Sequence, residues 1–221
     1  MPTAIGASLP YALAAALSPI PITAVTLILL ARRGLASGLF TAGRFFAYAL
    51  ILTLVVIGSE LIHPGTDVAP SPAGEIARFV LGAAAIGAGI WTWLRRSAEK
   101  SERSRRWVRA VTRVTAPRSA ALGFALSAGP KNWLLLAGGG LAIAGARVSW
   151  AGEALAGLVF VAVAASTAAV PVVLYYAIGA RALNALQSLQ DWMQTNGAAI
   201  SSVLLVVVGV VLVGSGFVGL L

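Results

Sequence analysis

Two apolar segments of the chain are interrupted at proline, and the two interruptions share a register. The first lies at residues 17–21 (Leu-Ser-Pro-Ile-Pro) and the second at residues 126–130 (Leu-Ser-Ala-Gly-Pro). The two serines are as far apart in the chain as the last prolines of the two motifs. A proline inside a helix removes a backbone donor, and in hydrocarbon the freed polar groups must find another partner. Paired interrupted segments in the two halves of a membrane protein indicate a transport site, so the sequence predicts a transporter.

The composition places the chain in a membrane. Of its 221 residues, 59% are hydrophobic and only 10% are charged, whereas a soluble domain carries about 25% charged residues. Apolar runs of about 20 residues, enough to cross a bilayer as a helix, recur along the chain. The six predicted spans are residues 8–31, 39–62, 73–94, 119–144, 152–178 and 198–220. The chain has no cysteine, which excludes disulfides and thiolate metal sites.

Basic residues are concentrated in one connection between these spans. Nine of the sixteen Lys and Arg residues fall between Arg95 and Arg118, and the connection at residues 63–72 has none. Lys and Arg accumulate in cytoplasmic loops. The odd-numbered connections are therefore predicted to be cytoplasmic, and both termini are predicted to face the outer side of the cytoplasmic membrane. We expect the arginines of the 95–118 connection to meet anionic headgroups of the inner leaflet rather than nucleic acid.

Three spans precede this basic connection and three follow it. Halves with an odd number of spans have opposite orientations in the membrane. The predicted fold is therefore an all-α membrane protein whose six transmembrane helices form two inverted three-helix repeats, with helices 1 and 4 broken at proline. The first repeat covers residues 1–94, the basic cytoplasmic connection residues 95–118, and the second repeat residues 119–221.

The residues around the two breaks form the candidate substrate site. Proline suits the first position of a helix, and a helix start carries unpaired N–H groups that attract anions. Ser18 and Ser127 are expected to cap the two new helix starts. The alternative interpretation is that the prolines only kink the helices for packing. The predicted substrate-binding residues are Ser18, Pro19, Pro21, Thr23, Ser127, Gly129, Pro130, Lys131 and Asn132.

Lys131 is the most informative single residue. A lysine at mid-bilayer costs about 2.5–3.5 kcal/mol on insertion scales, and the start of a helix also disfavours a cation. A bound anion would compensate both unfavourable effects, the burial of the charge and its position at a helix start. The alternative is a buried ion pair, although Glu60, Glu75 and Glu153 all lie near the outer ends of their predicted helices.

Arg44 lies about one turn inside the cytoplasmic end of the second predicted span. It either extends to the membrane surface, as long basic side chains do, or guards the inner mouth as a gate. The sequence contains no Ser/His/Asp arrangement, no acidic pair within the spans and no metal-binding cluster. We therefore expect neither an enzyme nor a bound metal or cofactor.

The layout and the break motifs resemble the lysine exporter (LysE) superfamily. Within it, residues 17–21 and residues 129–136 (Gly-Pro-Lys-Asn-Trp-Leu-Leu-Leu) look most like the GAP/Sap branch, the glycolipid- and peptidolipid-addressing proteins of actinobacterial envelopes. The resemblance leads us to expect Asn-Pro-Lys-Asn, but Gly129 occupies the first position here and removes one polar side chain. The resemblance implies a membrane lipid substrate that is moved towards the cell surface.

Three functions stay open at this point. The first is an exporter of an envelope glycolipid, peptidolipid or precursor, with the substrate held at the midplane between the two broken helices. The second is an exporter of a small solute of the amino-acid type. The third is a non-transporting accessory subunit of a lipid export or synthesis complex. The expected protein partner is a second copy, in a homodimer, or a larger lipid exporter. An apolar cavity open to the side would favour a lipid, and a closed polar pocket would favour a solute.

Overall fold

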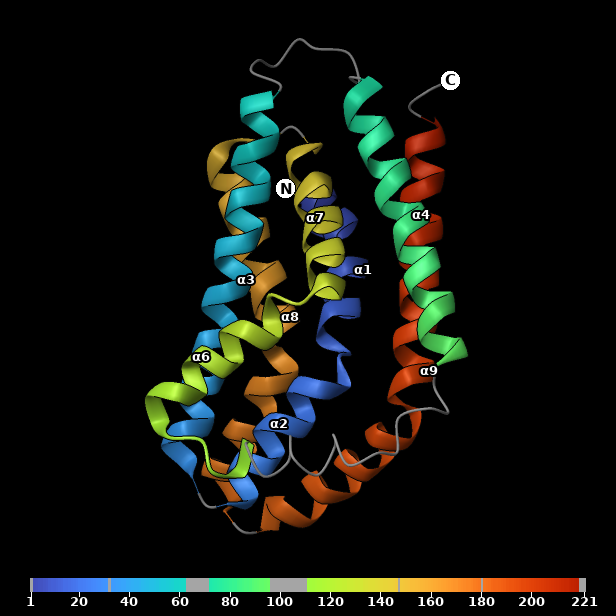
Figure 1. The fold of residues 1–221 in the computed structure, drawn as a ribbon. Helices are drawn as coiled ribbons and strands as arrows, with labels where there is room; N and C mark the ends of the chain where they lie inside the picture. Colours follow the sequence, from blue (N-terminus) through green and yellow to red (C-terminus); the bar gives the residue numbers. More distant parts are fainter. Residues whose placement is uncertain are drawn as a thin grey trace.

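The computed structural model describes residues 2–31, 33–62, 72–95, 111–146, 148–179 and 181–218. Almost all of these residues are helical, and the described ranges contain no β-strand, so the predicted all-α class is confirmed (Figure 1). The helices are α1 (Pro2–Ala16), α2 (Pro19–Leu30), α3 (Gly34–Ile62), α4 (Pro72–Leu94), α6 (Ala116–Ser127), α7 (Pro130–Ala144), α8 (Trp150–Ile178) and α9 (Arg181–Val218).

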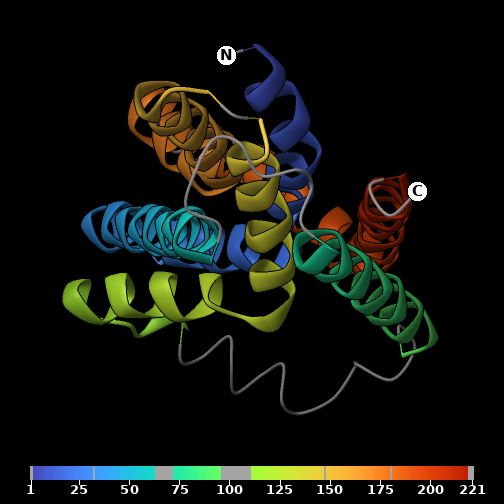
Figure 2. The same cartoon turned by 90° about the horizontal axis from the view of Figure 1, so that it is seen from above.

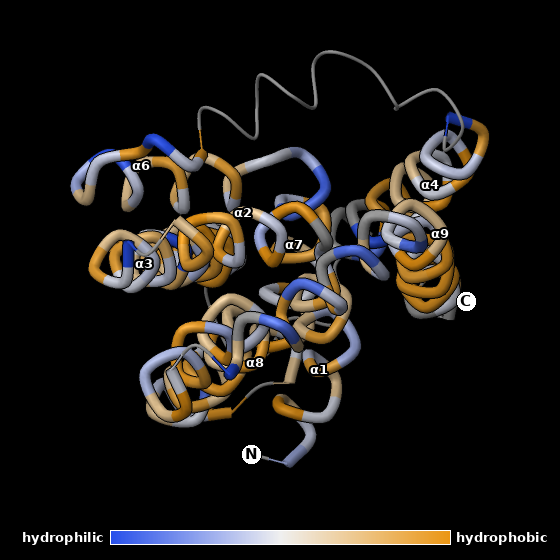
Figure 3. Tube along the Cα trace, turned by 90° about the horizontal axis from the view of Figure 1, so that it is seen from below, coloured by the Kyte–Doolittle hydropathy of each residue, from blue (hydrophilic) through white to orange (hydrophobic). Residues whose placement is uncertain are grey.

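Three helices are long and apolar enough to cross a membrane. They contain the apolar stretches Gly34–Ser59, Trp150–Ile178 and Thr195–Gly214, and hydrophobic colouring dominates the C-terminal part of α9 in Figure 3. The bent pair of α1 and α2 adds a fourth span if it is counted as one. The apolar part of α4, Arg78–Leu94, is shorter, and the predicted span 119–144 is divided between α6 and α7. The structure thus shows three or four spans by length, and the count of six stays a prediction.

Both predicted proline breaks occur in the structure. α1 ends at Ala16 and α2 begins at Pro19, with a bend of 52° between the two helices. α6 ends at Ser127 and α7 begins at Pro130. Each new helix starts at a proline. Proline lacks an N–H, and at the first position of a helix that N–H would have had no partner within the helix. Pro19 and Pro130 are the first residues of these two helices, and Pro21 lies two residues further along α2.

The helices pack in a few close pairs. α4 packs along α9 at one side of the bundle, α6 packs along α3, and α1 contacts both α7 and α8 (Figure 2). Glycine allows α6 to approach α3 closely, since a Cβ on Gly43 would collide with the carbonyl of Ala120, and one on Gly123 with that of Phe40. Small residues serve the same purpose at many helix contacts in membranes.

The last helix begins earlier than the sequence predicts. The sixth span was expected from residue 198, but α9 runs without interruption from Arg181 to Val218. Its first part crosses one end of the bundle before the helix turns along α4 (Figure 1). Ala182 and Leu186 are buried there with Leu29 of α2, and Tyr175 of α8 packs against them. This apolar contact extends the helix into the region that was expected to be a connection.

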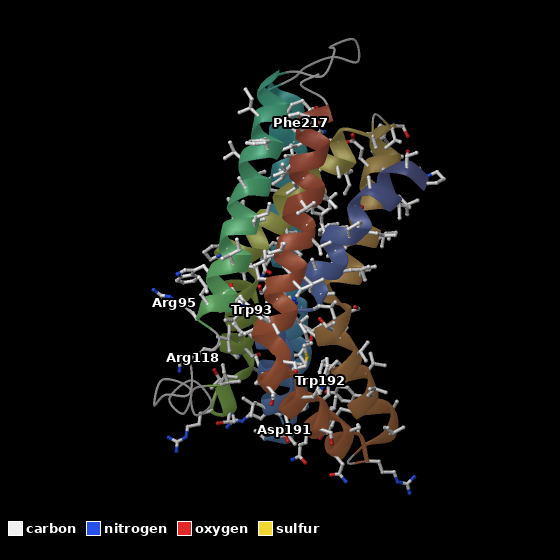
Figure 4. All side chains as sticks on the ribbon, turned by 90° about the vertical axis from the view of Figure 1, so that its right-hand side faces the viewer. Trp93, Arg95, Arg118, Asp191, Trp192 and Phe217 are labelled. Atoms are coloured by element: carbon white, nitrogen blue, oxygen red, sulfur yellow. The ribbon has the colours of Figure 1, made fainter. Side chains whose placement is uncertain are left out.

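Figure 4 shows where several charged and aromatic side chains lie along the bundle. Arg118 and Trp192 lie towards one end and Phe217 at the other, and Arg95 is near mid-height. Arg95 stacks over Trp91, with 4.5 Å between its Cζ atom and the ring centroid. Residues 96–110, which carry most of the arginines expected to meet lipid headgroups, lie outside the described residues.

Candidate functional site

At the first break, side chains from two other helices bind carbonyl groups at the end of α1. The Nη2 atom of Arg44, on α3, donates a hydrogen bond of 3.2 Å to the Ala15 carbonyl. The hydroxyl of Thr167, on α8, donates to the Ala16 carbonyl at 2.7 Å. The last carbonyls of a helix have no partner within the helix, and a cation is favoured at that end. These two bonds therefore let the chain break inside an apolar bundle.

At the second break, two buried polar side chains bond to the backbone of α6. The amide of Asn132 donates to the Leu126 carbonyl at 3.2 Å, and the hydroxyl of Ser127 donates to the Gly123 carbonyl at 2.8 Å. The expectation that Ser127 caps α7 is wrong, because Ser127 is the last residue of α6 and Gly129 occupies the N-cap position. Ser18 does occupy the N-cap position of α2, but its side chain makes no capping hydrogen bond.

Lys131 is the second residue of α7 and reaches across to α9. Its Nζ atom donates a hydrogen bond of 3.1 Å to the hydroxyl of Ser201. The buried ion pair considered for Lys131 is not found within the described ranges, where Glu75 instead pairs with Arg78 at 2.6 Å. That local pair agrees with the three-residue spacing of the two side chains on α4.

Arg44 lies deeper in the bundle than the sequence suggests. Because α3 begins at Gly34, Arg44 stands about 15 Å from the start of the helix at 1.5 Å per residue. Its side chain is 0% exposed, and its guanidinium lies over the ring of Tyr48, 4.7 Å from the centroid. The interpretation that Arg44 extends to the membrane surface is therefore wrong. Its role as a gate stays a prediction.

Arg44, Tyr48, Lys131 and Asn132 form what we call the cation cluster. The guanidinium of Arg44 lies over the ring of Tyr48, and Tyr48 adjoins Ser127, four residues before Lys131. The two positive charges are therefore near enough to influence each other. Among the described atoms, four polar groups of the cluster are buried without a hydrogen-bond partner: Arg44 Nε and Nη1, the Tyr48 hydroxyl and Asn132 Oδ1. A site with two positive charges and unused donors is suited to binding an anion.

Two other residues predicted for the site are buried in α2. Thr23 is buried in α2, and Pro21 is buried two residues after the start of that helix. The side chain of Pro19 lies outside the described residues. Sequence reasoning missed Tyr48, Thr167 and Ser201. Tyr48 follows Arg44 by four positions, a spacing that places both on one helix face and could have linked them.

An open apolar groove of about 630 Å³ lies beside the second break, between α4 and α7. Pro130, the residue before Lys131, is one of its walls. The lining residues are Leu81, Ala128, Pro130, Trp133, Leu134 and Ala137. A second open apolar groove, of about 700 Å³, runs between α3 and α8 past Thr41 and Phe45.

The comparisons with known proteins give one result. The family model described as Sap, sulfolipid-1-addressing protein, matches residues 9–218 of the chain. No curated protein and no solved structure matches the chain. The matched range includes both breaks, the whole cation cluster and the groove at Pro130.

Proposed function

Because the chain belongs to the sulfolipid-1-addressing protein (Sap) family, we propose that it exports an envelope glycolipid, a peptidolipid or a precursor of one across the cytoplasmic membrane. Membership confirms the resemblance to the GAP/Sap branch and makes the chain a lipid-addressing membrane protein. In the proposed mechanism, the polar part of the lipid is held at the midplane between the two broken helices. Its acyl chains remain in apolar surroundings beside α7.

The observation that carries this proposal is the position of the apolar groove next to the cation cluster. Pro130 lines the groove, and Lys131 follows it in the same helix turn. A lipid needs both environments at once, because its head is polar and its chains must stay out of water. The groove supplies the apolar environment and the cation cluster supplies the charged one.

The shape of the grooves favours a lipid over a small solute. Both grooves are open to the side and lined by apolar atoms. Sites for small ligands are usually concave and bury most of the ligand surface. An amino-acid exporter would therefore need a more enclosed polar pocket than these two grooves provide.

We also propose that the six predicted spans form two inverted repeats. The helix contacts support this symmetry: α1 packs on α8 as α6 packs on α3, and α2 contacts α9 as α7 contacts α4. Two further pairs, α3 with α8 and α4 with α9, each join a helix to its own counterpart. α3 and α8 are also equally long, at 29 residues each.

The contacts at the helix ends support the proposed orientation. Arg33, in the first connection, donates to the carbonyl of Val114, just before α6, at 2.8 Å. The contact of Ala182 and Leu186 with Leu29 of α2 brings the fifth connection to the same end. The odd-numbered connections thus share one end, and its arginines favour the cytoplasmic side.

The decisive experiment measures envelope lipid at the surface of cells that depend on this chain for it. Lys131→Gln removes the ammonium without leaving an acid unpaired, so we expect an inserted protein that no longer exports lipid. Lys131→Arg should be partly active, since a planar guanidinium does not replace a compact ammonium. Protein level in the membrane is checked by blot. Full export by Lys131→Gln would contradict the proposal and favour an accessory subunit in a larger export complex.

A further inference from the structure

Arg44 is completely buried, and most of its hydrogen-bonding capacity is unused. Its Nη2 atom bonds to the Ala15 carbonyl, whereas Nε and Nη1 have no partner in the part of the chain that the structure describes. A guanidinium keeps its charge inside a protein. A permanent charge with free donors in an apolar bundle is unfavourable unless something binds it. The end of α1 accounts for only one of its three nitrogen atoms.

Lys131 brings a second positive charge to the same place. Tyr48 links Arg44, which lies over its ring, to Ser127 near the start of α7, and like charges brought this near disfavour each other. Within the described ranges neither cation forms a salt bridge. The ring of Tyr48 lies under the guanidinium. Its hydroxyl is buried beside Ser127 and forms no hydrogen bond of acceptable geometry with the described residues. Two repelling cations from α3 and α7, with a free hydroxyl beside them, make the site unfavourable without an anion. A bound anion would turn the repulsion into two attractions.

We propose that Arg44 and Lys131 together bind one tetrahedral oxyanion, a sulfate or phosphate group, and that Tyr48 donates a further hydrogen bond to it. The donors available are Arg44 Nε and Nη1, Lys131 Nζ and the Tyr48 hydroxyl. Four donor groups and two positive charges match a group with three or four oxygens better than a carboxylate with two. This inference rests on the proposed function where it assigns the anion to a lipid headgroup, but the same receptor chemistry would hold a free inorganic anion.

The binding test uses the purified full-length protein in a neutral detergent. Thermal unfolding is followed in sodium sulfate, sodium phosphate and sodium chloride at equal ionic strength. A ligand that binds only the native state raises Tm in a saturable way, while sulfate also stabilises proteins in general. Arg118→Gln is the matched control, because it removes the same charge from an exposed arginine.

We expect a saturable rise in Tm for the wild type and for Arg118→Gln. Arg44→Gln and Lys131→Gln should show only the general effect of sulfate. Tyr48→Phe should weaken the affinity for sulfate by about tenfold or less, since it removes one neutral donor. A wild-type response of either Gln variant would overturn the proposal. If Arg44→Gln fails to fold without its bond to Ala15, then Lys131→Gln decides the question on its own, and a wild-type response of that variant would overturn the proposal.

A second arm identifies the source of the anion. Octyl sulfate below its micellar concentration is compared with inorganic sulfate, and octyl glucoside serves as the uncharged control. Saturation by octyl sulfate at about tenfold lower concentration would support a lipid headgroup, since the chain adds apolar burial. Equal concentrations would support a receptor for a free anion. Because transport is not measured, a protein that binds sulfate but exports no lipid would contradict the proposed function and leave the oxyanion receptor standing.

Discussion

Lys131 of α7 and Ser201 of α9 are joined by a hydrogen bond of 3.1 Å, which connects the second broken helix to the α4–α9 pair. The next residue, Ser202, points to a different neighbour and donates to the Gly89 carbonyl of α4 at 2.8 Å. Two adjacent serines therefore serve two separate contacts. The first holds a cation of the candidate site, and the second holds two helices together.

Ser201→Ala and Ser202→Ala should consequently have different effects. A neutral side-chain hydrogen bond contributes about 0.5–1.5 kcal/mol. Ser201→Ala should weaken sulfate affinity and lower export by less than about tenfold, because Lys131 loses the group that orients it. Ser202→Ala should lower Tm and leave sulfate affinity unchanged. Measurements of Tm and of sulfate affinity on both variants separate the two roles. Equal sulfate affinities for the two variants would show that Ser201 does not orient Lys131.

The contact between α3 and α6 predicts opposite results for two glycines of one helix. Gly43→Ala places a methyl group against the Ala120 carbonyl and should destabilise the protein by about 1–3 kcal/mol through overpacking. Gly58→Ala, also in α3, meets nothing within 4 Å. It should be neutral or stabilising by up to about 1 kcal/mol, because alanine favours a helix. Tm values of both variants in detergent test the pair. A stable Gly43→Ala protein would show that α6 does not lie this close to α3.

The sequence predicted the helical class and the position of both breaks, because proline acts locally on a helix. It also pointed to Lys131, whose charge stands out in an apolar segment. It could not predict which side chains bond to the backbone carbonyls at the breaks. Thr167 and the Ala16 carbonyl, for example, come together through the packing of α8 on α1. The depth of Arg44 was misjudged for a similar reason. The start of α3 depends on contacts at its end, where Gly34 lies against Tyr176.

The first break itself can be tested at Thr167. Thr167→Val keeps the shape of the side chain and removes the donor to the Ala16 carbonyl. That carbonyl still accepts a bond from the Ser18 N–H at 2.7 Å, so we expect a loss of only about 0.5–1.5 kcal/mol. Ser166→Ala is the matched control, since the Ser166 hydroxyl bonds to Val163 of its own helix. A fall in Tm for Thr167→Val alone would support the role of α8 in holding the break. Equal changes in both variants would contradict it.

The proposed orientation can be tested with single cysteines, because the chain has none of its own. Asp67→Cys and Val148→Cys lie in even-numbered connections, and Ser104→Cys and Ser188→Cys lie in or next to odd-numbered ones. A membrane-impermeant thiol reagent added to whole cells should label positions 67 and 148 but not positions 104 and 188, since loops rich in arginine stay in the cytoplasm. Permeabilised cells provide the control that all four thiols can react. The reverse pattern would invert the orientation. Labelling of positions 67 and 104 from the same side would rule out a membrane crossing by α4 and, with it, the proposed inverted repeats.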